Sequence, residues 1–240
     1  MRVGSDLVEA SAFQGPDGWT ACLSSQVGCP VGCVFCKTAR IAHGRNLSAS
    51  EMKAQLEAVS ADLGQAPFRV SLSAQGEPLL NVSACLDAAH ACESRNMAFE
   101  FCTCGIPDGL ERVLKESTAS VTLTLHTCDS RKRARIMPLT ADWPLDEVLS
   151  IWRREGKGRT LRISFALVDG WNDGVEEKES LVRISQSVDC EVELAALRFG
   201  TGLSIDKRAV AAFGSSLEAS GVRVSYRTMV EPALVSMRGY

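Results

Sequence analysis

The sequence alternates strand-like and helix-like segments from residue 20 almost to its end. "FRVSLSAQG" at 68–76, for example, alternates apolar and small residues, and the segment after it has the spacing of a helix. Strands joined by helices of this length predict right-handed crossovers and therefore a parallel sheet. The expected strands cover 20–24, 68–76, 97–105, 120–127, 160–170, 190–200 and 222–228, and the expected helices cover 48–63, 82–93, a segment from 107, 145–154, 175–187 and 205–220.

Six or seven strand–helix units predict an α/β fold whose parallel strands close partly or fully into a (β/α)6 barrel. The alternative is an open, doubly wound sheet, which periodicity does not distinguish from a barrel. The sequence has no internal repeat, low-complexity tract or linker. We therefore expect one domain over residues 1–240, with 1–18 as a short N-terminal extension and 228–240 as a C-terminal tail.

Composition and charge narrow the classes of function. Apolar residues make up 45% of the chain and charged residues 23%, and the formal net charge is −3. This balance gives no overall attraction to nucleic acid, so RNA contact would need a local basic patch, for which "SRKRAR" at 130–135 is the candidate. No apolar run reaches the roughly 20 residues that span a bilayer, and no signal peptide is visible. We expect a cytoplasmic protein without a membrane partner.

Three cysteines stand together in "SSQVGCPVGCVFCKTAR" at 24–40, with the spacing C-x3-C-x2-C. A [4Fe–4S] cluster that only transfers electrons is usually held by a cysteine on each iron. Three cysteines, here Cys29, Cys33 and Cys36, leave one iron open to bind a small molecule. The loop follows the first expected strand, so it would lie at the carboxyl-terminal mouth of a parallel barrel, where such folds do their chemistry.

Two alternatives compete with a cluster. A structural zinc site would need a fourth ligand, for which His43 is available, but zinc ligands usually occur as two spaced pairs. The ten cysteines of the chain also raise the idea of a disulfide framework. Disulfide-stapled domains are usually secreted and much shorter, so the pattern favours a cluster.

The spacing of the cysteines, with Phe35 before the third, resembles the radical S-adenosylmethionine (SAM) superfamily. The surrounding motifs narrow the resemblance to the RNA adenine-C2 methyltransferases and their chloramphenicol–florfenicol resistance relatives, which methylate adenine C8. The resemblance to this family extends from about Glu9 to Arg227. The matching motifs are "CLSSQVGC" at 22–29, "RNL" at 45–47, "GEP" at 76–78, "LH" at 125–126 and "NDG" at 172–174.

The resemblance implies a radical SAM barrel, a [4Fe–4S] cluster on Cys29, Cys33 and Cys36, and SAM bound to the open iron. The SAM contacts would come from residues near the ends of strands: Gly76 and Glu77 at the amino group, the triplet Thr124, Leu125 and His126, and Asn172 at the carboxylate. Cys102 takes the place of a family serine in this pocket. Glu9 corresponds to the family's acid–base glutamate, and Cys22 to a family cysteine just before the loop.

Two departures from the family pattern stand out. The family carries its methyl group on a cysteine in the tail over the active site, but residues 228–240 contain no cysteine, and Met237 stands at about that position. A thioether has no proton to lose, so we expect the usual two-step methyl transfer to fail. The residues before the cysteine loop do not resemble the family's N-terminal RNA-binding domain, so we expect a radical SAM domain that acts without it.

Three functional hypotheses follow. The favoured one is a radical SAM enzyme that makes a 5'-deoxyadenosyl radical, takes electrons from a flavodoxin- or ferredoxin-like reductant, and modifies a small or nucleotide-like substrate. The second is RNA adenine methylation with another carrier, such as Cys102 or Cys104, or with a partner protein. The third is a non-catalytic protein that binds the cluster and SAM. Glu9, Glu77 and Asn172, which stand at family positions, favour an enzyme.

Overall fold

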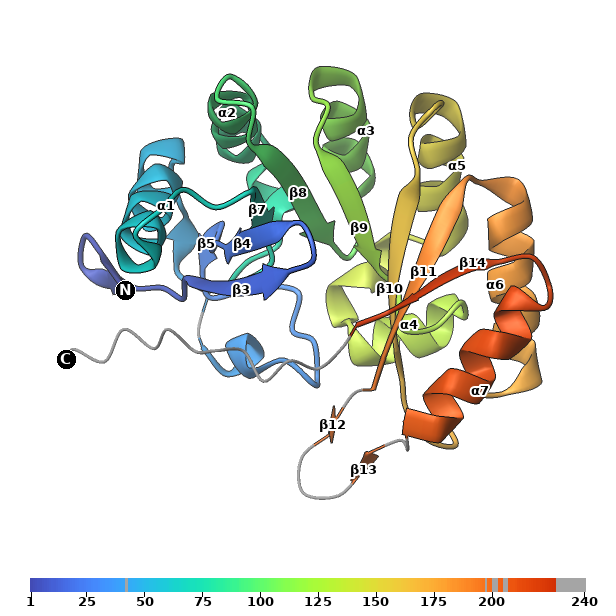
Figure 1. Cartoon of the computed structure of the whole chain (residues 1–240). Coiled ribbons are helices and arrows are strands. Elements are labelled where there is room, and N and C mark those ends of the chain that lie inside the picture. The colour runs from blue at the N-terminus through green and yellow to red at the C-terminus, as the bar shows by residue number, and fades with distance from the viewer. Residues whose placement is uncertain (42, 197, 200–202, 205–206, 228–240) are drawn as a thin grey trace.

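One curled sheet of eight strands forms the centre of the fold (Figure 1). The computed structural model describes residues 1–41, 43–196, 198–199, 203–204 and 207–227. The strand order is β14-β11-β10-β9-β8-β7-β4-β3, and every neighbouring pair is parallel except β3 and β4. The strands are β3 (Ser11–Gly15), β4 (Gly18–Cys22), β7 (Arg69–Leu72), β8 (Ala98–Thr103), β9 (Ser120–Thr124), β10 (Leu161–Leu167), β11 (Cys190–Ala196) and β14 (Arg223–Tyr226).

Helices follow the outer, convex face of this sheet (Figure 1). Of the expected arrangements, the structure is therefore a partial barrel: an open half-barrel with β14 and β3 as its edges, rather than a doubly wound sheet. The main helices are α1 (Ala49–Leu63), α2 (Val82–Glu93), α3 (Pro107–Glu116), α5 (Leu145–Glu155), α6 (Val175–Ser187) and α7 (Lys207–Glu218).

Local sequence signals explain where the first helix begins and ends. Ser48 and Glu51 form a capping box at the start of α1, in which the Glu51 N–H donates to the Ser48 hydroxyl and the Ser48 N–H donates to the Glu51 carboxylate. Gly64 ends the helix in the left-handed conformation, which glycine adopts without strain. The start of α1 was predicted from the capping-box spacing and is confirmed.

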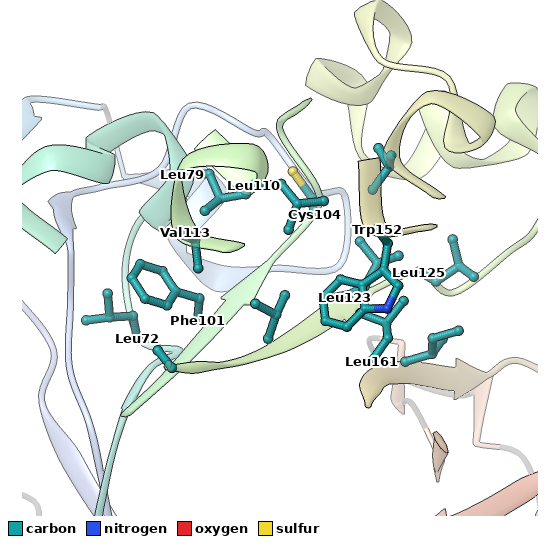
Figure 2. Close-up of a cluster of buried hydrophobic side chains, with 14 of the residues drawn as sticks. Leu72, Leu79, Phe101, Cys104, Leu110, Val113, Leu123, Leu125, Trp152 and Leu161 are labelled. Atoms are coloured by element: carbon teal, nitrogen blue, oxygen red, sulfur yellow. The ribbon is translucent and has the colours of Figure 1, made fainter. Parts of the chain in front are cut away.

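The hydrophobic core lies between the sheet and the outer helices. Alternate residues of the strands point outward, and Phe101, Leu123 and Phe165 are all at most 2% exposed there. Figure 2 shows Phe101 beside Leu72 and Val113, and Trp152 of α5 over Leu123. Burying a large apolar side chain stabilises a fold by about 1.5–3 kcal/mol, so this layer fixes which face of each strand looks inward.

The structure also contains elements that the sequence analysis did not anticipate. β3 lies within the supposed N-terminal extension and pairs antiparallel with β4. A short helix, α4 (Ser130–Ile136), and the 3-10 turn η3 (Pro138–Asp142) occupy the basic segment after β9. Two small antiparallel pairs, β1 (Arg2–Val3) with β2 (Asp6–Leu7) and β5 (Gln26–Val27) with β6 (Arg45–Asn46), flank the barrel, and the cysteine loop lies between β5 and β6 in the chain. None of the described helices has the length and hydropathy of a membrane span.

We predict that Gly109→Ala destabilises the protein, although the same change inside a helix normally stabilises it by about 0.5–1 kcal/mol. A Cβ at Gly109 in α3 would lie 2.6 Å from the Leu79 carbonyl oxygen and 2.7 Å from the Leu79 Cβ. Such overpacking costs about 1–3 kcal/mol. Urea unfolding would measure the change, with the exposed neighbour Asp108→Ala as the control. A Gly109→Ala protein as stable as the parent would show that Leu79 moves freely.

Candidate functional site

The cysteine loop lies between β5 and the 3-10 turn η1 (Lys37–Arg40), at the mouth where the parallel strands end (Figure 1). Cys29, Cys33 and Cys36 are free and partly exposed. Gly28 and Gly32, which separate the loop into short turns, have φ values of 71° and 72°, in the left-handed region that glycine accepts. The loop therefore presents three thiols on a tightly turned backbone.

The three thiols lie close enough to influence one another electrostatically. Burial raises the pKa of the Cys29 thiol to about 11 and that of Cys33 to about 12, and Glu77 and the Cys36 thiol add to both shifts. The backbone N–H groups of Val31 and Gly76 face the Cys29 sulfur and act in the opposite direction. Metal ligation requires the thiolate, so iron would have to displace these protons.

The loop after β7 clamps the entry to the cysteine loop. The N–H groups of Ser25 and Gln26 donate to the Gln75 carbonyl oxygen at 2.8 and 3.3 Å. Gly76 has a φ of 105°, and a Cβ there would lie 2.6 Å from the Ser25 hydroxyl oxygen and 2.7 Å from the Gln26 nitrogen. Only a glycine lets the loop after β7 pack this closely against Ser25 and Gln26. This packing brings the Gly76 backbone next to the Cys29 sulfur.

Glu77 is 3% exposed, and its carboxylate is occupied by protein donors. One oxygen accepts from the Leu79 N–H at 3.0 Å and the Thr103 hydroxyl at 2.5 Å, and the other accepts from the Cys104 N–H at 2.8 Å. Burial raises the pKa of Glu77, and these hydrogen bonds lower it. The side chain ties the end of β7 to the end of β8 beside the cysteine loop.

His126 lies directly after β9 and faces the same loop. Its ring packs edge-on against Phe35, with the centroids 4.9 Å apart, and Phe35 precedes Cys36. The Ala166 N–H donates to Nδ1 at 3.1 Å, so Nδ1 is unprotonated and a neutral ring carries its hydrogen on Nε2. Burial lowers the pKa of His126 to about 4, which keeps the ring neutral at pH 7.

Asn172 braces the strand ends around His126. Its amide nitrogen donates to the His126 and Ala166 carbonyl oxygens at 2.7 and 2.8 Å, and its oxygen accepts from the Val168 N–H at 2.7 Å. The side chain is fully buried. Both amide hydrogens are therefore used within the protein, and they hold His126 at its φ of 59°, in the left-handed region.

The remaining predicted residues divide between the mouth and the concave face of the sheet. Leu125 buries its side chain in the core, while Thr124 ends β9 on the concave side. Cys22 and Cys102 also lie on this side, where the Ser71 hydroxyl and the Cys102 sulfur are 3.3 Å apart. Glu9 has an exposed side chain, and its carbonyl oxygen accepts from the Ser24 hydroxyl at 2.5 Å.

The concave face is polar, unlike the packed interior of an ordinary barrel, which bulky branched residues fill. Glu100 accepts from the Thr122 hydroxyl at 2.6 Å and from the Arg162 guanidinium at 3.3 Å. Arg227 donates to Glu193 at 2.9 Å. These groups come from five neighbouring strands or their ends, so they form a continuous polar lining below the mouth.

The candidate RNA patch at 130–135 does not form one continuous exposed surface, and RNA contact there stays a prediction. These residues fall on helix α4, and Arg133, in the middle of the run, is only 1% exposed. Lys132 lies 3.8 Å from Glu177 in an ion pair. Arg131 and Arg135 are exposed and Lys132 is half-buried, so three of the four cations of the run reach the surface.

The three thiols fit a cluster better than a single ion. Within the described ranges, no group of three or more histidine, cysteine, aspartate or glutamate side chains is arranged to hold one metal ion. Each cysteine of a cubane binds a different iron, so its ligands are spaced more widely than those of one ion. The three thiols are partly exposed, Cys29 and Cys36 interact electrostatically, and the Gly76 backbone lies close to Cys29. These features fit a loop that surrounds a cluster.

A half-barrel with a three-cysteine loop at the carboxyl ends of its strands defines a class of iron–sulfur protein. Sequence comparison agrees, since the model of the radical SAM superfamily matches residues 23–177. The chain therefore belongs to the radical SAM superfamily. Members use a [4Fe–4S] cluster and SAM, as was expected for this chain from its cysteine spacing.

The chain is also similar to RNA methyltransferases. It is 33% identical over 225 residues to the probable dual-specificity RNA methyltransferase RlmN of Moorella thermoacetica, covering 87% of this chain and 64% of that protein. A Thermus thermophilus protein of the same name is 32% identical over 225 residues, with 87% of this chain and 63% of that protein covered. The chain thus spans a little under two thirds of the length of these relatives.

Among solved structures, a radical SAM methyltransferase from Sphaerobacter thermophilus superposes with a TM-score of 0.85 at 27% identity, covering 92% of this chain and 70% of that one. These comparisons confirm the expected resemblance, the partial-barrel fold and the assignment as an enzyme of methyltransferase type by resemblance. They are silent on the individual SAM-binding and catalytic residues, which remain predictions.

Sequence reasoning missed several residues that shape the site. Gln75 and Asn81 flank the "GEP" motif, and Asn81 donates to the Ser25 carbonyl oxygen at 2.8 Å. Glu177, in the first turn of α6, accepts from the Thr127 hydroxyl at 2.5 Å. Arg133 could have been recognised from helical spacing, since it stands four residues before the buried Met137.

We predict that replacing Cys29, Cys33 and Cys36 together with alanine abolishes cluster binding, because no thiolate would remain on the loop. Anaerobic reconstitution followed by iron and sulfide analysis should give about four of each per chain for the parent protein and none for the variant. The buried Cys85→Ala is the control and should keep its iron. Full iron content in the triple variant would contradict the assignment.

A second prediction concerns Asn172. Asn172→Asp puts a carboxylate oxygen against the His126 and Ala166 carbonyl oxygens and removes both donors, so it should destabilise the protein more than Asn172→Ala. Each buried group left without a partner costs about 1–3 kcal/mol. Thermal unfolding of both variants would measure the order of their stabilities, with the nearby exposed Asp169→Ala as the control. Equal stability of the Asp variant and the parent would show that Asn172 is not a brace.

Proposed function

We propose that this chain is a radical SAM enzyme that reductively cleaves SAM and modifies a nucleotide-like substrate without a methyl-carrier cysteine at position 237. The observation that carries the proposal is the convergence of the three-cysteine loop, the Gly76 backbone and neutral His126 at one mouth of the barrel. A polar concave face lies directly below. Together these features provide a place for the cluster, for SAM and for a polar substrate.

When bound, the cluster and SAM supply an electron and a 5'-deoxyadenosyl radical able to abstract hydrogen. Cys29, Cys33 and Cys36 would hold the cluster. Gly76 and His126 would offer a backbone group and an Nε2–H to SAM. Glu77 would remain an acceptor near its amino group, whereas Asn172 would act through His126, since both of its amide hydrogens are already donated.

The concave face supports a substrate rich in hydrogen-bonding groups. Glu100, which is buried, and Arg162, which is partly exposed, offer an acceptor and a donor that fix the orientation of a polar ligand. A nucleobase matches this chemistry. The names of the relatives favour RNA, rather than a free small molecule, as the source of that base, so an adenine-containing RNA is the first substrate to test.

Methyl transfer to RNA adenine is the second candidate, because Cys22 and Cys102 face the concave side as alternative carriers. A carrier must be a thiolate to attack a methyl group. Burial raises the pKa of Cys22, and it raises the pKa of Cys102 well above its usual value, with Glu100 adding to both shifts. Both thiols are therefore protonated at neutral pH, which favours radical chemistry without a cysteine carrier.

The proposal also assigns partners and surroundings. A radical SAM enzyme needs a one-electron reductant, and we propose a flavodoxin- or ferredoxin-like protein for that role. All ten cysteines are free thiols, a state that the reducing cytoplasm maintains. We place the enzyme there.

We predict that the anaerobic protein with SAM and dithionite forms 5'-deoxyadenosine, because reductive cleavage of SAM does not require a methyl-carrier cysteine. No S-adenosylhomocysteine should accumulate, and mass spectrometry should find no methylated cysteine. Cys22→Ser and Cys102→Ser should still release 5'-deoxyadenosine, whereas the triple cluster-loop variant should not. A methyl group on Cys22 or Cys102, together with S-adenosylhomocysteine, would return the enzyme to the methyltransferases. Absence of 5'-deoxyadenosine from cluster-loaded protein would contradict the proposal itself.

A further inference from the structure

Arg133 is a buried cation beside the cysteine loop. It lies on α4 and is 1% exposed, and its terminal nitrogens donate to two backbone carbonyl oxygens, those of Cys104 and Trp143. Its Nε has no hydrogen-bond partner. Among the residues that the structure describes, no carboxylate lies within ion-pair distance of Arg133, in contrast to Arg162 and Arg227 on the concave face.

A buried guanidinium without a counterion is expensive for a fold, since desolvation of the charge is not offset by a partner. Four ionisable groups lie within electrostatic reach of it: Cys104, Glu77, Cys33 and His126, whose ring is neutral. Burial raises the pKa of the Cys104 thiol well above its usual value, which keeps it neutral. Glu77 already accepts three hydrogen bonds from other groups. Cys33 is the group that becomes an anion when it ligates iron.

The backbone fixes Arg133 next to that ligand. The Val34 N–H donates to the Ile136 carbonyl oxygen at 3.0 Å, and the Leu139 N–H donates to the Val31 carbonyl oxygen at 3.3 Å. A Cβ on Gly32 would lie 3.9 Å from the Pro138 ring. The α4–η3 segment is thus attached to both sides of Cys33, so the distance between the guanidinium and the cluster loop is set by the fold.

We propose that Arg133 is a positioning residue of the iron–sulfur site that supplies a fixed positive charge beside the Cys33-ligated cluster and raises its reduction potential. The cluster gains one negative charge when it accepts an electron, so a neighbouring cation stabilises the reduced form more than the oxidised form. The inference rests on the cluster binding that forms part of the proposed function. It does not depend on SAM cleavage or on the substrate.

The test compares Arg133→Gln, Arg133→Lys and Arg131→Gln. Arg131 is an exposed arginine on the same helix, so its variant makes the same change in net charge away from the loop. Each protein is reconstituted anaerobically, its iron is counted, and the midpoint potential of the cluster is measured by a titration followed by electron paramagnetic resonance. We expect Arg133→Gln to be harder to reduce by at least tenfold in the equilibrium constant, which is about 59 mV for one electron. Arg133→Lys and Arg131→Gln should stay close to the parent.

An unchanged potential in a loaded Arg133→Gln protein would overturn the proposal, as would an equal shift in Arg131→Gln. If Arg133→Gln does not retain its cluster, Arg133→Lys decides: it keeps the charge but not the planar fork of donors. An Arg133→Lys protein that binds the cluster with a parent-like potential supports a charge effect. If Arg133→Lys also fails to bind the cluster, Arg133 has only a packing role and the proposal is overturned. Loaded proteins with the expected potentials but no SAM cleavage would refute the proposed function and leave this inference intact.

Discussion

The alternation of side chains along parallel strands is the constraint on which the rest of this structure depends. One set of residues, such as Phe101, Ile163 and Leu194, is covered by helices, and this apolar burial determines that their neighbours face inward. The inward set includes Glu100 and Arg162, which form an ion pair with each other. Because the strands are parallel, all of their carboxyl ends open at one mouth, and the loops that carry chemistry meet there.

Two buried glutamates hold that mouth in shape by the same arrangement. Glu77 accepts from the Thr103 hydroxyl and the Cys104 N–H, just where β8 ends. Glu177 accepts from the Thr127 hydroxyl at 2.5 Å and the Cys128 N–H at 2.8 Å, just after β9. Each carboxylate thus satisfies backbone and hydroxyl donors that a strand end would otherwise leave unpaired. A site built on strand ends fixed in this way is preorganised, since its supporting groups have little freedom to move.

Much of the fold could be predicted from the sequence, because helix caps and hydrophobic periodicity are local. The bounds of α6 were expected at 175–187 and are observed there. β3 was missed because its pairing with β4 depends on a partner strand rather than on its own pattern. The cluster site could be predicted because the spacing of the three cysteines in the loop is itself characteristic. The bracing roles of Glu77 and Asn172 did not, because their partners are backbone groups up to 46 residues away, which only the folded chain brings together.

In the sequence, the residues proposed to hold the cluster and SAM are separate from the position of the family's methyl carrier. This separation suggests how such an enzyme could change its reaction. The groups proposed to hold the cluster and SAM stand on strand ends that Glu77, Asn172 and the apolar layer fix. The position expected to correspond to the family's methyl carrier, about Met237, comes after the last strand of the sheet in the sequence, outside the described residues. Replacing a carrier cysteine there would remove the nucleophile, whereas the residues proposed to hold the cluster and SAM lie elsewhere in the sequence. In the proposed function, radical formation would therefore persist when methyl transfer is lost, since the two steps would depend on different residues.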